Sequence, residues 1–581
     1  MAARLALRFL RFAAVAAAGA ATSIVAAQPA APIRATTQLV VSANPHASDA
    51  GLKILRAGGS AVDAAIAVQL VLTLVEPQSS GIGGGAFMLV FAAPGGTAPG
   101  TITAYEGRET APAAATPDMF LNANGRAEPF GNVGVGGLSV GVPGVLRMLE
   151  LAHREHGRLP WAELFTPAIE LAESGFEVSP RLFALLNGFK RFARGEDFRR
   201  HFYDASGEPH PVGFRLVNSE YAAALKLLAA SGAAPMYTGE LAAAIVAEVQ
   251  GNNVRPGRMT TEDLAKYQAH VSTPLCSVYR TWQVCGPQLP SSGGVTTQQI
   301  LGMLGRFDLA ALRAQPVSAI HLFAEANRLA FADRNLYLGD PAFVADPVAA
   351  LLDPRYLRAR AALIDPSKAA PSVAAGLPLP LAAWEYAPSS PNERPSTSHF
   401  SIVDKFGAAV AMTTSVQGAF GSQLMVGGFI LNNQMTDFDY EPTVDGKPVA
   451  NRIEGGKRPL SSMAPTMLLD GDGRLRLLVG SPGGTRIIGF VAQTIVGLAD
   501  WQLDVQQAVA APHFLAEEGP IELEEGTPLA AHEAALEALG HTVALRNLNS
   551  GLHAIAIDYN GTGRVLSGGV DPRREGAARG D

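Results

Sequence analysis

The chain has 581 residues, of which 48% are hydrophobic and 17% charged, and its formal net charge is −7. This length gives material for about three or four domains or one large composite fold. The hydrophobic fraction is too low for a bundle of membrane spans, and no basic stripe is present that would neutralise a phosphate backbone. Composition therefore excludes an integral membrane bundle, makes nucleic acid a poor partner and favours small-molecule chemistry.

The first 27 residues predict a secretory signal peptide. Arg4, Arg8 and Arg11 carry the charges, and residues 12–27 form an alanine-rich run that ends in small side chains. The run is shorter than the ~20 residues that a membrane span needs. We expect cleavage after Ala27 and export to the periplasm or the extracellular space, with no membrane span in the mature protein.

Hydrophobic periodicity in the first part of the chain predicts several helices and one buried strand. Residues 61–75 are almost wholly apolar, so this helix is expected in the core. The strand covers residues 87–91. The expected helices cover residues 46–57, 61–75, 145–156, 161–174, 219–231, 239–250 and 316–335.

The two cysteines flank a predicted hairpin. Residues 277–284 are rich in β-branched and aromatic types around a turn at Arg280 and Thr281, which places Cys276 opposite Cys285. In an oxidising compartment the pair can form a cross-strand disulfide, and two buried thiols are the alternative. Neither cysteine has a histidine or helix N-terminus nearby in sequence to activate it as a nucleophile.

A proline-, alanine- and serine-rich stretch over residues 361–396 predicts an exposed linker. After it, residues 398–404 and 408–416 are expected to pair as a tight hairpin. The rest of the chain alternates strands, at 466–469 and 475–479, with helices at 486–498 and 504–511. This alternation predicts a layered α/β arrangement.

Three motifs are better explained as structural. Gly81–Ala86 matches a dinucleotide-binding glycine pattern, but a helix precedes it and a strand follows, which is the reverse of what that fingerprint needs. Ser139 lies in a G-x-S-x-G pattern, yet the preceding glycines do not suit the buried strand of a hydrolase elbow, so a glycine turn is favoured. His153 and His156 have no third ligand in sight, so no metal site is predicted.

Thr397 is the strongest candidate nucleophile. It follows the linker and begins a strand, so chain cleavage before it would leave a threonine with a free α-amine. That amine has an unperturbed pKa of about 7.7–8.0 and can take the proton of its own hydroxyl. Downstream, Gly480–Gly484 offers backbone amides for an oxyanion, and residues 432–437 place amides and a carboxylate where an ammonium can bind.

Eight segments, taken in their order along the chain, together resemble one protein family. They are Glu76–Gly85, Gly107–Pro112, Ser139–Gly144, Leu329–Arg334, Thr397–His399, Leu431–Met435, Lys457–Met463 and Gly480–Gly484. Together they resemble the γ-glutamyltranspeptidases, also called γ-glutamyltransferases or glutathione hydrolases, from about Ala35 to Arg574. The segments Lys457–Met463 and Gly480–Gly484 are the most specific.

The resemblance implies a four-layer αββα sandwich of the N-terminal nucleophile hydrolase type, made as one precursor. It implies self-cleavage between Ser396 and Thr397 into a large subunit (28–396) and a small catalytic subunit (397–581) that stay associated. It implies no cofactor or metal. The expected substrates are glutathione or other γ-glutamyl compounds, with water or acceptor amino acids and peptides receiving the acyl group.

The resemblance also assigns roles to individual residues. Thr397 would attack the γ-amide carbon, and the amides of Gly483 and Gly484 would stabilise the oxyanion. The expected substrate-binding residues are Arg108, Ser461 and Ser462 for the α-carboxylate, and Gln434 and Asp437 for the α-amine. Opposite charges thus meet at each end of the donor.

The sequence departs from the family pattern near the nucleophile. Ser398 and Ser415 stand where threonine is usual, and each keeps a hydroxyl that can bond the new amine or the nucleophile. Gln417 stands where many members have asparagine, which affects efficiency and donor choice. Residues 438–456 are shorter than in members with a long lid, although Tyr440 could supply an aromatic cover.

Three rival functions follow from the same residues. A cephalosporin or glutaryl amidase on this scaffold would act on substrates without the α-ammonium, which Asp437 and Gln434 argue against. An inactive exported binding protein would not need Thr397, the paired serines and the paired glycines. A serine hydrolase built on Ser139 is the third alternative.

Overall fold

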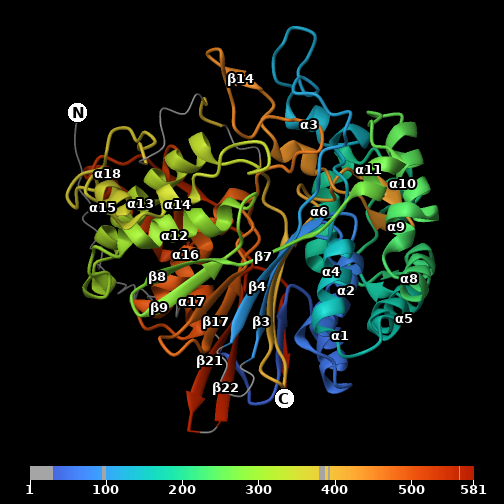
Figure 1. The fold of residues 1–581 in the computed structure, drawn as a ribbon, viewed down its shortest axis with the longest axis horizontal. Coiled ribbons are helices and arrows are strands. Elements are labelled where there is room, and N and C mark those ends of the chain that lie inside the picture. Colours follow the sequence, from blue (N-terminus) through green and yellow to red (C-terminus); the bar gives the residue numbers. More distant parts are fainter. Residues whose placement is uncertain (1–30, 94–99, 379–385, 390–392, 562) are drawn as a thin grey trace, which may run out of the picture.

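The computed structural model describes residues 31–93, 100–378, 386–389, 393–561 and 563–581, so the expected signal peptide lies outside the described residues. Two seven-stranded antiparallel sheets lie at the centre, with helices on both outer sides (Figure 1). The prediction of a four-layer αββα sandwich is confirmed. Among the described residues, no helix is long and apolar enough to cross a membrane.

The strands of each sheet come from distant parts of the chain. The first sheet has the order β1 (Ile33–Ala35), β22 (Gly563–Val570), β21 (His553–Asn560), β17 (Leu475–Gly480), β16 (Thr466–Leu469), β9 (Trp282–Gly286) and β8 (Leu275–Tyr279). The second has the order β23 (Ala577–Gly580), β2 (Leu39–Ser42), β10 (Ser398–Val403), β11 (Ala409–Ser415), β3 (Gly85–Ala92), β4 (Thr101–Gly107) and β7 (His270–Ser272). Both sheets therefore combine strands from the two sides of Thr397.

Two helical layers enclose the sheets. The second sheet is covered by α1 (Pro45–Arg56), α2 (Ala61–Val75), α4 (Val145–His156), α5 (Thr166–Ser174) and α8 (Ser219–Ser231). The first sheet is covered by α12 (Ser292–Leu304), α13 (Pro316–Tyr337), α16 (Ile487–Ala499) and α17 (Val505–Ala510). Other helices flank them, among them α3 (Phe130–Val133), α6 (Pro180–Phe189), α9 (Ala234–Thr238), α10 (Glu240–Gly251), α11 (Thr261–Lys266), α14 (Val348–Leu351), α15 (Pro354–Ala361) and α18 (Glu533–Ala538).

The alternation of side chains along β10 builds two cores at once. Phe400 and Ile402 point to the helices over the second sheet, whereas Val403 packs between the two sheets. This is the period of two that a strand imposes. Helix α2, expected in the core, is buried at every residue, and a capping box between Ser60 and Asp63 fixes its start.

Most predicted elements are confirmed, and the cysteine alternative is resolved. Residues 275–279 and 282–286 form the expected hairpin, in which Cys276 pairs directly with Cys285 through a disulfide. Ser139 lies in a 3₁₀ turn, and its buried hydroxyl donates to the Gly136 carbonyl at 2.9 Å, as a structural turn requires.

The prediction of an exposed linker is wrong at its end. Ala387, Ser389 and Ser396 are buried, because this part of the chain bonds to the body of the protein. The Ser389 amide donates to the Asn335 carbonyl at 2.7 Å, and the Ser396 hydroxyl donates to the Gln78 carbonyl at 2.7 Å. Residues 379–385 and 390–392 lie outside the described residues.

The glycines at 83 and 84 serve close backbone packing. A Cβ on Gly84 would lie 2.1 Å from the Ser415 carbonyl oxygen, and one on Gly83 would lie 2.2 Å from the Ile430 oxygen. These glycines let the chain pass directly behind the end of β11. The glycine pattern that resembled a dinucleotide fingerprint thus supports the strand end that carries Ser415.

We expect Gly84→Ala to displace the end of β11, because the added methyl group cannot fit against backbone. The free energy of unfolding should fall by about 1–3 kcal/mol or more, which a thermal melt detects as a lower midpoint. Gly131→Ala is the control, since a Cβ there meets nothing within 4 Å. An unchanged midpoint for Gly84→Ala would contradict this packing.

Candidate active site

Most of the site residues predicted from sequence line one cavity, whereas Arg108, Ser462 and Gly483 are not among its lining residues. β10 and β11 pair so that Ser398 faces Thr414, which brings Thr397 beside Ser415. The cavity is lined by Glu393, Arg394, Thr397, Ser415, Gln417, Gln434, Asp437, Ser461, Met463, Gly484 and Ile487. Only about 10 Å³ of it is open, so the protein's own side chains nearly fill it.

Thr397 is held by its hydroxyl in a costly backbone conformation. Its Oγ1 donates to Ser415 Oγ at 3.0 Å, and the backbone N–H of Gln417 donates to the same Ser415 oxygen at 2.9 Å. The φ of Thr397 is +88°, which a β-branched residue rarely adopts. Such a conformation costs about 1–3 kcal/mol and persists because the surroundings fix it.

The peptide bond before Thr397 is polarised and anchored. The Gly483 amide donates to the Ser396 carbonyl oxygen at 3.2 Å, and Arg574 Nη1 donates to the Thr397 carbonyl oxygen at 3.0 Å. Gly483 and Gly484 have φ values of +143° and +63°, which favour glycine. An amide that points at a carbonyl oxygen is the arrangement that stabilises a tetrahedral oxyanion.

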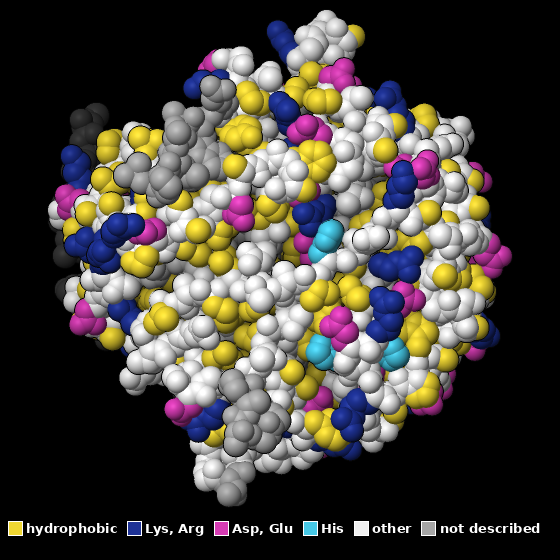
Figure 2. All heavy atoms as spheres, viewed as in Figure 1, with side chains coloured by type: hydrophobic (Ala, Val, Ile, Leu, Met, Phe, Trp, Pro, Cys, Tyr) yellow, Lys and Arg dark blue, Asp and Glu magenta, His cyan; other side chains and the backbone are white. Residues whose placement is uncertain are grey.

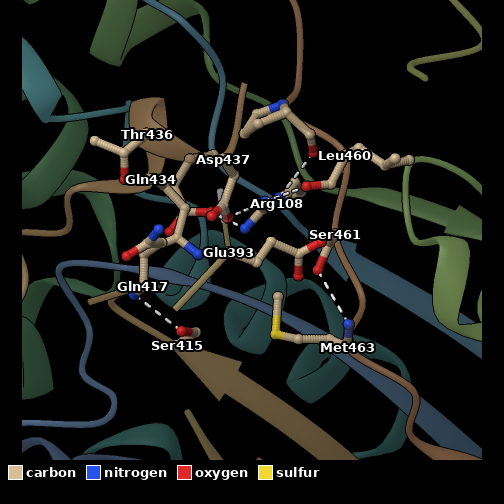
Figure 3. Close-up of polar contacts among 12 residues, drawn as sticks. Arg108, Glu393, Ser415, Gln417, Gln434, Thr436, Asp437, Leu460, Ser461 and Met463 are labelled. Carbon is tan, nitrogen blue, oxygen red and sulfur yellow. Dashed lines mark hydrogen bonds and ion pairs between the residues drawn. The ribbon is translucent and has the colours of Figure 1, made fainter. Parts of the chain in front are cut away.

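A buried pair of opposite charges, Arg108 and Asp437, lies at the cavity (Figure 3). Arg108 Nη2 donates to Asp437 Oδ2 at 2.6 Å, and Arg108 Nη1 contacts Glu109 at 3.3 Å. Burial raises the pKa of Asp437 to about 6, although Arg108 opposes this shift. Burial likewise raises the pKa of Glu109 to about 8. The pair places a cation and an anion side by side in a space shielded from water.

Several buried polar atoms in the cavity lack a hydrogen-bond partner within the protein. They are Asp437 Oδ1, Gln434 Oε1 and both side-chain atoms of Gln417. Gln417 lies close enough to Asp437 to lower its pKa, without a hydrogen bond of standard length. Leaving a buried polar atom unpaired costs about 1–3 kcal/mol, so these atoms suit a bound polar ligand.

Local sequence explains how these side chains are aimed. Asn432 Nδ2 donates to the Gly83 and Gly141 carbonyls at 2.8 Å, and Asn433 Nδ2 donates to the Gly134 carbonyl at 2.9 Å. The two asparagines thereby tie the chain to three glycine loops. The 3₁₀ turn Gln434–Asp437 follows directly and places its two polar ends in the cavity.

Ser462, one of the paired serines, binds a residue that was not predicted from the sequence. The Ser462 amide and hydroxyl both donate to the Glu393 carboxylate, at 3.0 and 2.8 Å. Arg334 Nη2 contacts the same carboxylate at 2.5 Å. Ser461 Oγ accepts from the Met463 amide at 3.2 Å. Arg334 lies in one of the segments that resemble the family. Glu393 was not singled out, because it lies in the stretch that was predicted to be an exposed linker.

Two further sequence expectations lie outside the cavity lining. Tyr440 packs on Phe120, with ring centroids 4.9 Å apart, and does not line the cavity beside Thr397. His153 and His156 contact the Leu159 carbonyl and the Tyr105 hydroxyl. In the described part of the chain, no group of three or more His, Cys, Asp or Glu side chains could hold a metal ion.

The chain resembles known proteins over nearly its whole length. The family model described as gamma-glutamyltranspeptidase matches residues 47–580. The glutathione hydrolase proenzyme of Escherichia coli K12 is 38% identical over 93% of this chain and 91% of its own. The acylase ACY 1 proenzyme of Pseudomonas sp. strain SE83 is 37% identical over 94% of each chain. The crystal structure of cephalosporin acylase from Bacillus halodurans superposes with a TM-score of 0.84, at 27% identity, over 96% of this chain and 98% of that one.

We expect Gly483→Ala to slow cleavage of the Ser396–Thr397 bond by about 100-fold or more, because the variant displaces the amide donor. A Cβ at Gly483 would lie 2.9 Å from the Phe490 ring, at a φ of +143°. A denaturing gel run over time on freshly purified protein measures the rate. Gly473→Ala, also at positive φ but in open space, is the control. Equal rates for Gly483→Ala and the unmodified chain would contradict the role of this amide.

Proposed function

The chain belongs to the γ-glutamyltranspeptidase family, and we propose that it cuts itself before Thr397 and then acts as a γ-glutamyltransferase and glutathione hydrolase. One observation carries the proposal. The hydroxyl of Thr397 and the amide-bound carbonyl of Ser396 lie beside the buried charges of Arg108 and Asp437. Nucleophile, oxyanion donor and a cradle for a zwitterion are therefore in one place.

Self-cleavage begins with attack of Thr397 Oγ1 on the Ser396 carbonyl carbon. The new C–O bond forms as the C–N bond breaks, and the threonine nitrogen takes the proton, which leaves an ester. Water then hydrolyses the ester and frees both the hydroxyl and the α-amine of Thr397. The products are a large subunit (28–396) and a small subunit (397–581), which remain associated because each sheet contains hydrogen-bonded strands from both of them.

The mature site performs acyl transfer with the same atoms. The α-amine of Thr397 takes the hydroxyl proton as Oγ1 attacks the γ-amide carbon of the donor, and the amides of Gly483 and Gly484 bind the oxyanion. The leaving amine takes the proton as the C–N bond breaks. Water, or an acceptor amino acid or peptide, then releases the γ-glutamyl group from the ester.

Charge complementarity selects the donor. Arg108, Ser461 and Ser462 bind its α-carboxylate, while Asp437 and Gln434 bind its α-ammonium. Asp437 Oδ1 and Gln434 Oε1 have no hydrogen-bond partner within the protein, so both can accept from a ligand. An ammonium group supplies three donors. Glutathione and other γ-glutamyl compounds present both charges next to the scissile amide. Gln417 projects into the same cavity and narrows it.

An acylase acting on glutaryl groups is the second candidate, because an acylase proenzyme matches the chain as fully as the glutathione hydrolases do. A glutaryl group lacks the α-ammonium, so Asp437 would stay buried with no positive ligand group. A serine hydrolase based on Ser139 is disfavoured, because its hydroxyl is buried and donates to a carbonyl. An inactive binding protein would not need a strained threonine on an amide-bound carbonyl.

We propose from the N-terminal sequence that the protein acts outside the cytoplasm. The arginines and the alanine-rich run of residues 1–27 support export through a signal peptide to the periplasm or beyond. The disulfide between Cys276 and Cys285 suits an oxidising compartment.

We expect the mature enzyme to cleave γ-glutamyl-p-nitroanilide about 10- to 100-fold more efficiently than glutaryl-p-nitroanilide, because the ammonium forms a charge-assisted bond to Asp437. Steady-state kcat/KM for the two donors measures this preference. Asp437→Asn should reduce it to a few-fold, mainly by raising KM for the γ-glutamyl donor. Equal kcat/KM for both donors in the unmodified enzyme would support the acylase function instead.

The pH profile should separate the two ionisations. The α-amine of Thr397 has a pKa of about 7.7–8.0 if unperturbed. Its protonation removes the base, so a plot of log kcat/KM against pH has a slope of one on the acid side. Burial raises the pKa of Asp437 to about 6, so its carboxyl group is neutral below that pH and no longer attracts the ammonium group of the donor. For the γ-glutamyl donor the slope should therefore steepen to two below about pH 6.

The glutaryl donor is the internal control for this profile, since it has no ammonium to lose. Its slope should remain one on the same enzyme. A steepening shared by both donors would assign the second proton to a group other than Asp437.

A further inference from the structure

The carboxylate of Glu393 is bound in the uncut chain as a ligand would be. Its Oε1 accepts from Arg334 Nη2 at 2.5 Å and from Ser462 Oγ at 2.8 Å, and its Oε2 accepts from the Ser462 amide at 3.0 Å. The side chain is 9% exposed. Two oxygens held by a guanidinium, a hydroxyl and a backbone amide form a complete carboxylate site.

This carboxylate lies within the catalytic cavity. Glu393 lines the cavity together with Thr397 and Asp437 and precedes Thr397 by four residues. Its charge raises the pKa of both Asp437 and Arg108, which places it within electrostatic reach of the donor cradle. Figure 3 shows it among Arg108, Asp437 and Ser461.

Arg334 has one guanidinium nitrogen directed at this site, and the rest of the group is fixed. Its Nε donates to Ser292 Oγ at 2.9 Å and its Nη1 to Asn335 Oδ1 at 3.0 Å. Its Nη2 contacts Glu393 and Ser462. The side chain is buried on helix α13, so packing and these bonds preorganise it.

Arg108 has most of its N–H groups bonded within the protein, which leaves one for a donor carboxylate. Its Nε donates to the Pro459 carbonyl, and its Nη2 donates to the Leu460 carbonyl and to Asp437. Its remaining nitrogen contacts Glu109. Arg334 is therefore the guanidinium that already binds a carboxylate at Ser462.

We propose that Arg334 and Ser462 form a subsite for the carboxylate of the donor, and that Glu393 fills this subsite until the chain is cut. This inference rests on the proposed γ-glutamyl activity. Cleavage turns residues 393–396 into a free chain end, which lets the donor carboxylate replace that of Glu393. Arg334 is thus a second determinant of donor specificity beside Arg108.

The test compares two donors in Arg334→Gln. The first is γ-glutamyl-p-nitroanilide, and the second is 4-aminobutanoyl-p-nitroanilide, which keeps the ammonium and lacks the carboxylate. For the first, kcat/KM should fall by about 10- to 100-fold, mainly through KM, because a charge-assisted contact is lost. For the second it should change less than about threefold, since that donor never made the contact. Arg334→Lys should restore part of the loss.

Arg328→Gln on the same helix is the matched control, because Arg328 pairs with Glu325 away from the cavity. Both donors should react with it as with the unmodified enzyme. An equal fall for both donors in Arg334→Gln would show a structural role and overturn the inference. If the unmodified enzyme cleaves neither donor, the proposed function itself fails, which is a distinct result.

A second measurement applies if Arg334→Gln does not mature. Glu393→Gln removes the charge that Arg334 binds and keeps the side-chain size, so self-cleavage should slow by about tenfold because the segment before Thr397 is held less firmly. Glu393→Asp should lie between Glu393→Gln and the unmodified chain. Glu525→Gln, at an exposed glutamate, is the control. Cleavage of Glu393→Gln at the unmodified rate would overturn the inference.

Discussion

The hydrogen bond from the Gly483 amide to the Ser396 carbonyl is the interaction on which the site depends. It joins the two sheets, because Ser396 precedes β10 of one sheet and Gly483 follows β17 of the other. The sheets must approach closely for this contact, and Gly480 permits it, since a Cβ there would lie 2.3 Å from the ring of His399. The αββα sandwich therefore brings Thr397, at the start of a strand in one sheet, to the Gly483 amide at the end of a strand in the other, as the proposed acyl transfer requires.

Charge within the cavity is balanced before any substrate binds. Arg108 is paired with Asp437 and Glu109, and Arg334 is paired with Glu393, so both buried cations are neutralised in the uncut chain. Burying an unpaired charge would cost several kcal/mol, so the Glu393 carboxylate stabilises the buried guanidinium of Arg334. Under the proposed function, cleavage and donor binding would exchange one carboxylate for another, with little change in net buried charge.

Local patterns in the sequence predicted the elements, and tertiary contacts decided the rest. The apolar run of α2, the amphipathic helix α4 and the hairpin of β10 and β11 follow from periodicity and turn residues alone. The buried end of the linker does not, because its contacts with Asn335 and Gln78 join residues far apart in sequence. For the same reason, the sequence motifs predicted that Arg108 and Asp437 belong to one site but not that they form an ion pair. No motif pointed to Glu393.

N-terminal sequencing of the purified protein, combined with intact-mass spectrometry, shows whether the chain cuts itself before Thr397. Self-cleavage at this bond yields two fragments, the smaller of which begins at Thr397. A mature N-terminus at that residue would make the strained threonine the nucleophile of the enzyme. A single chain in which the Ser396–Thr397 bond stays intact, or a fragment that begins elsewhere, would contradict self-cleavage at Thr397.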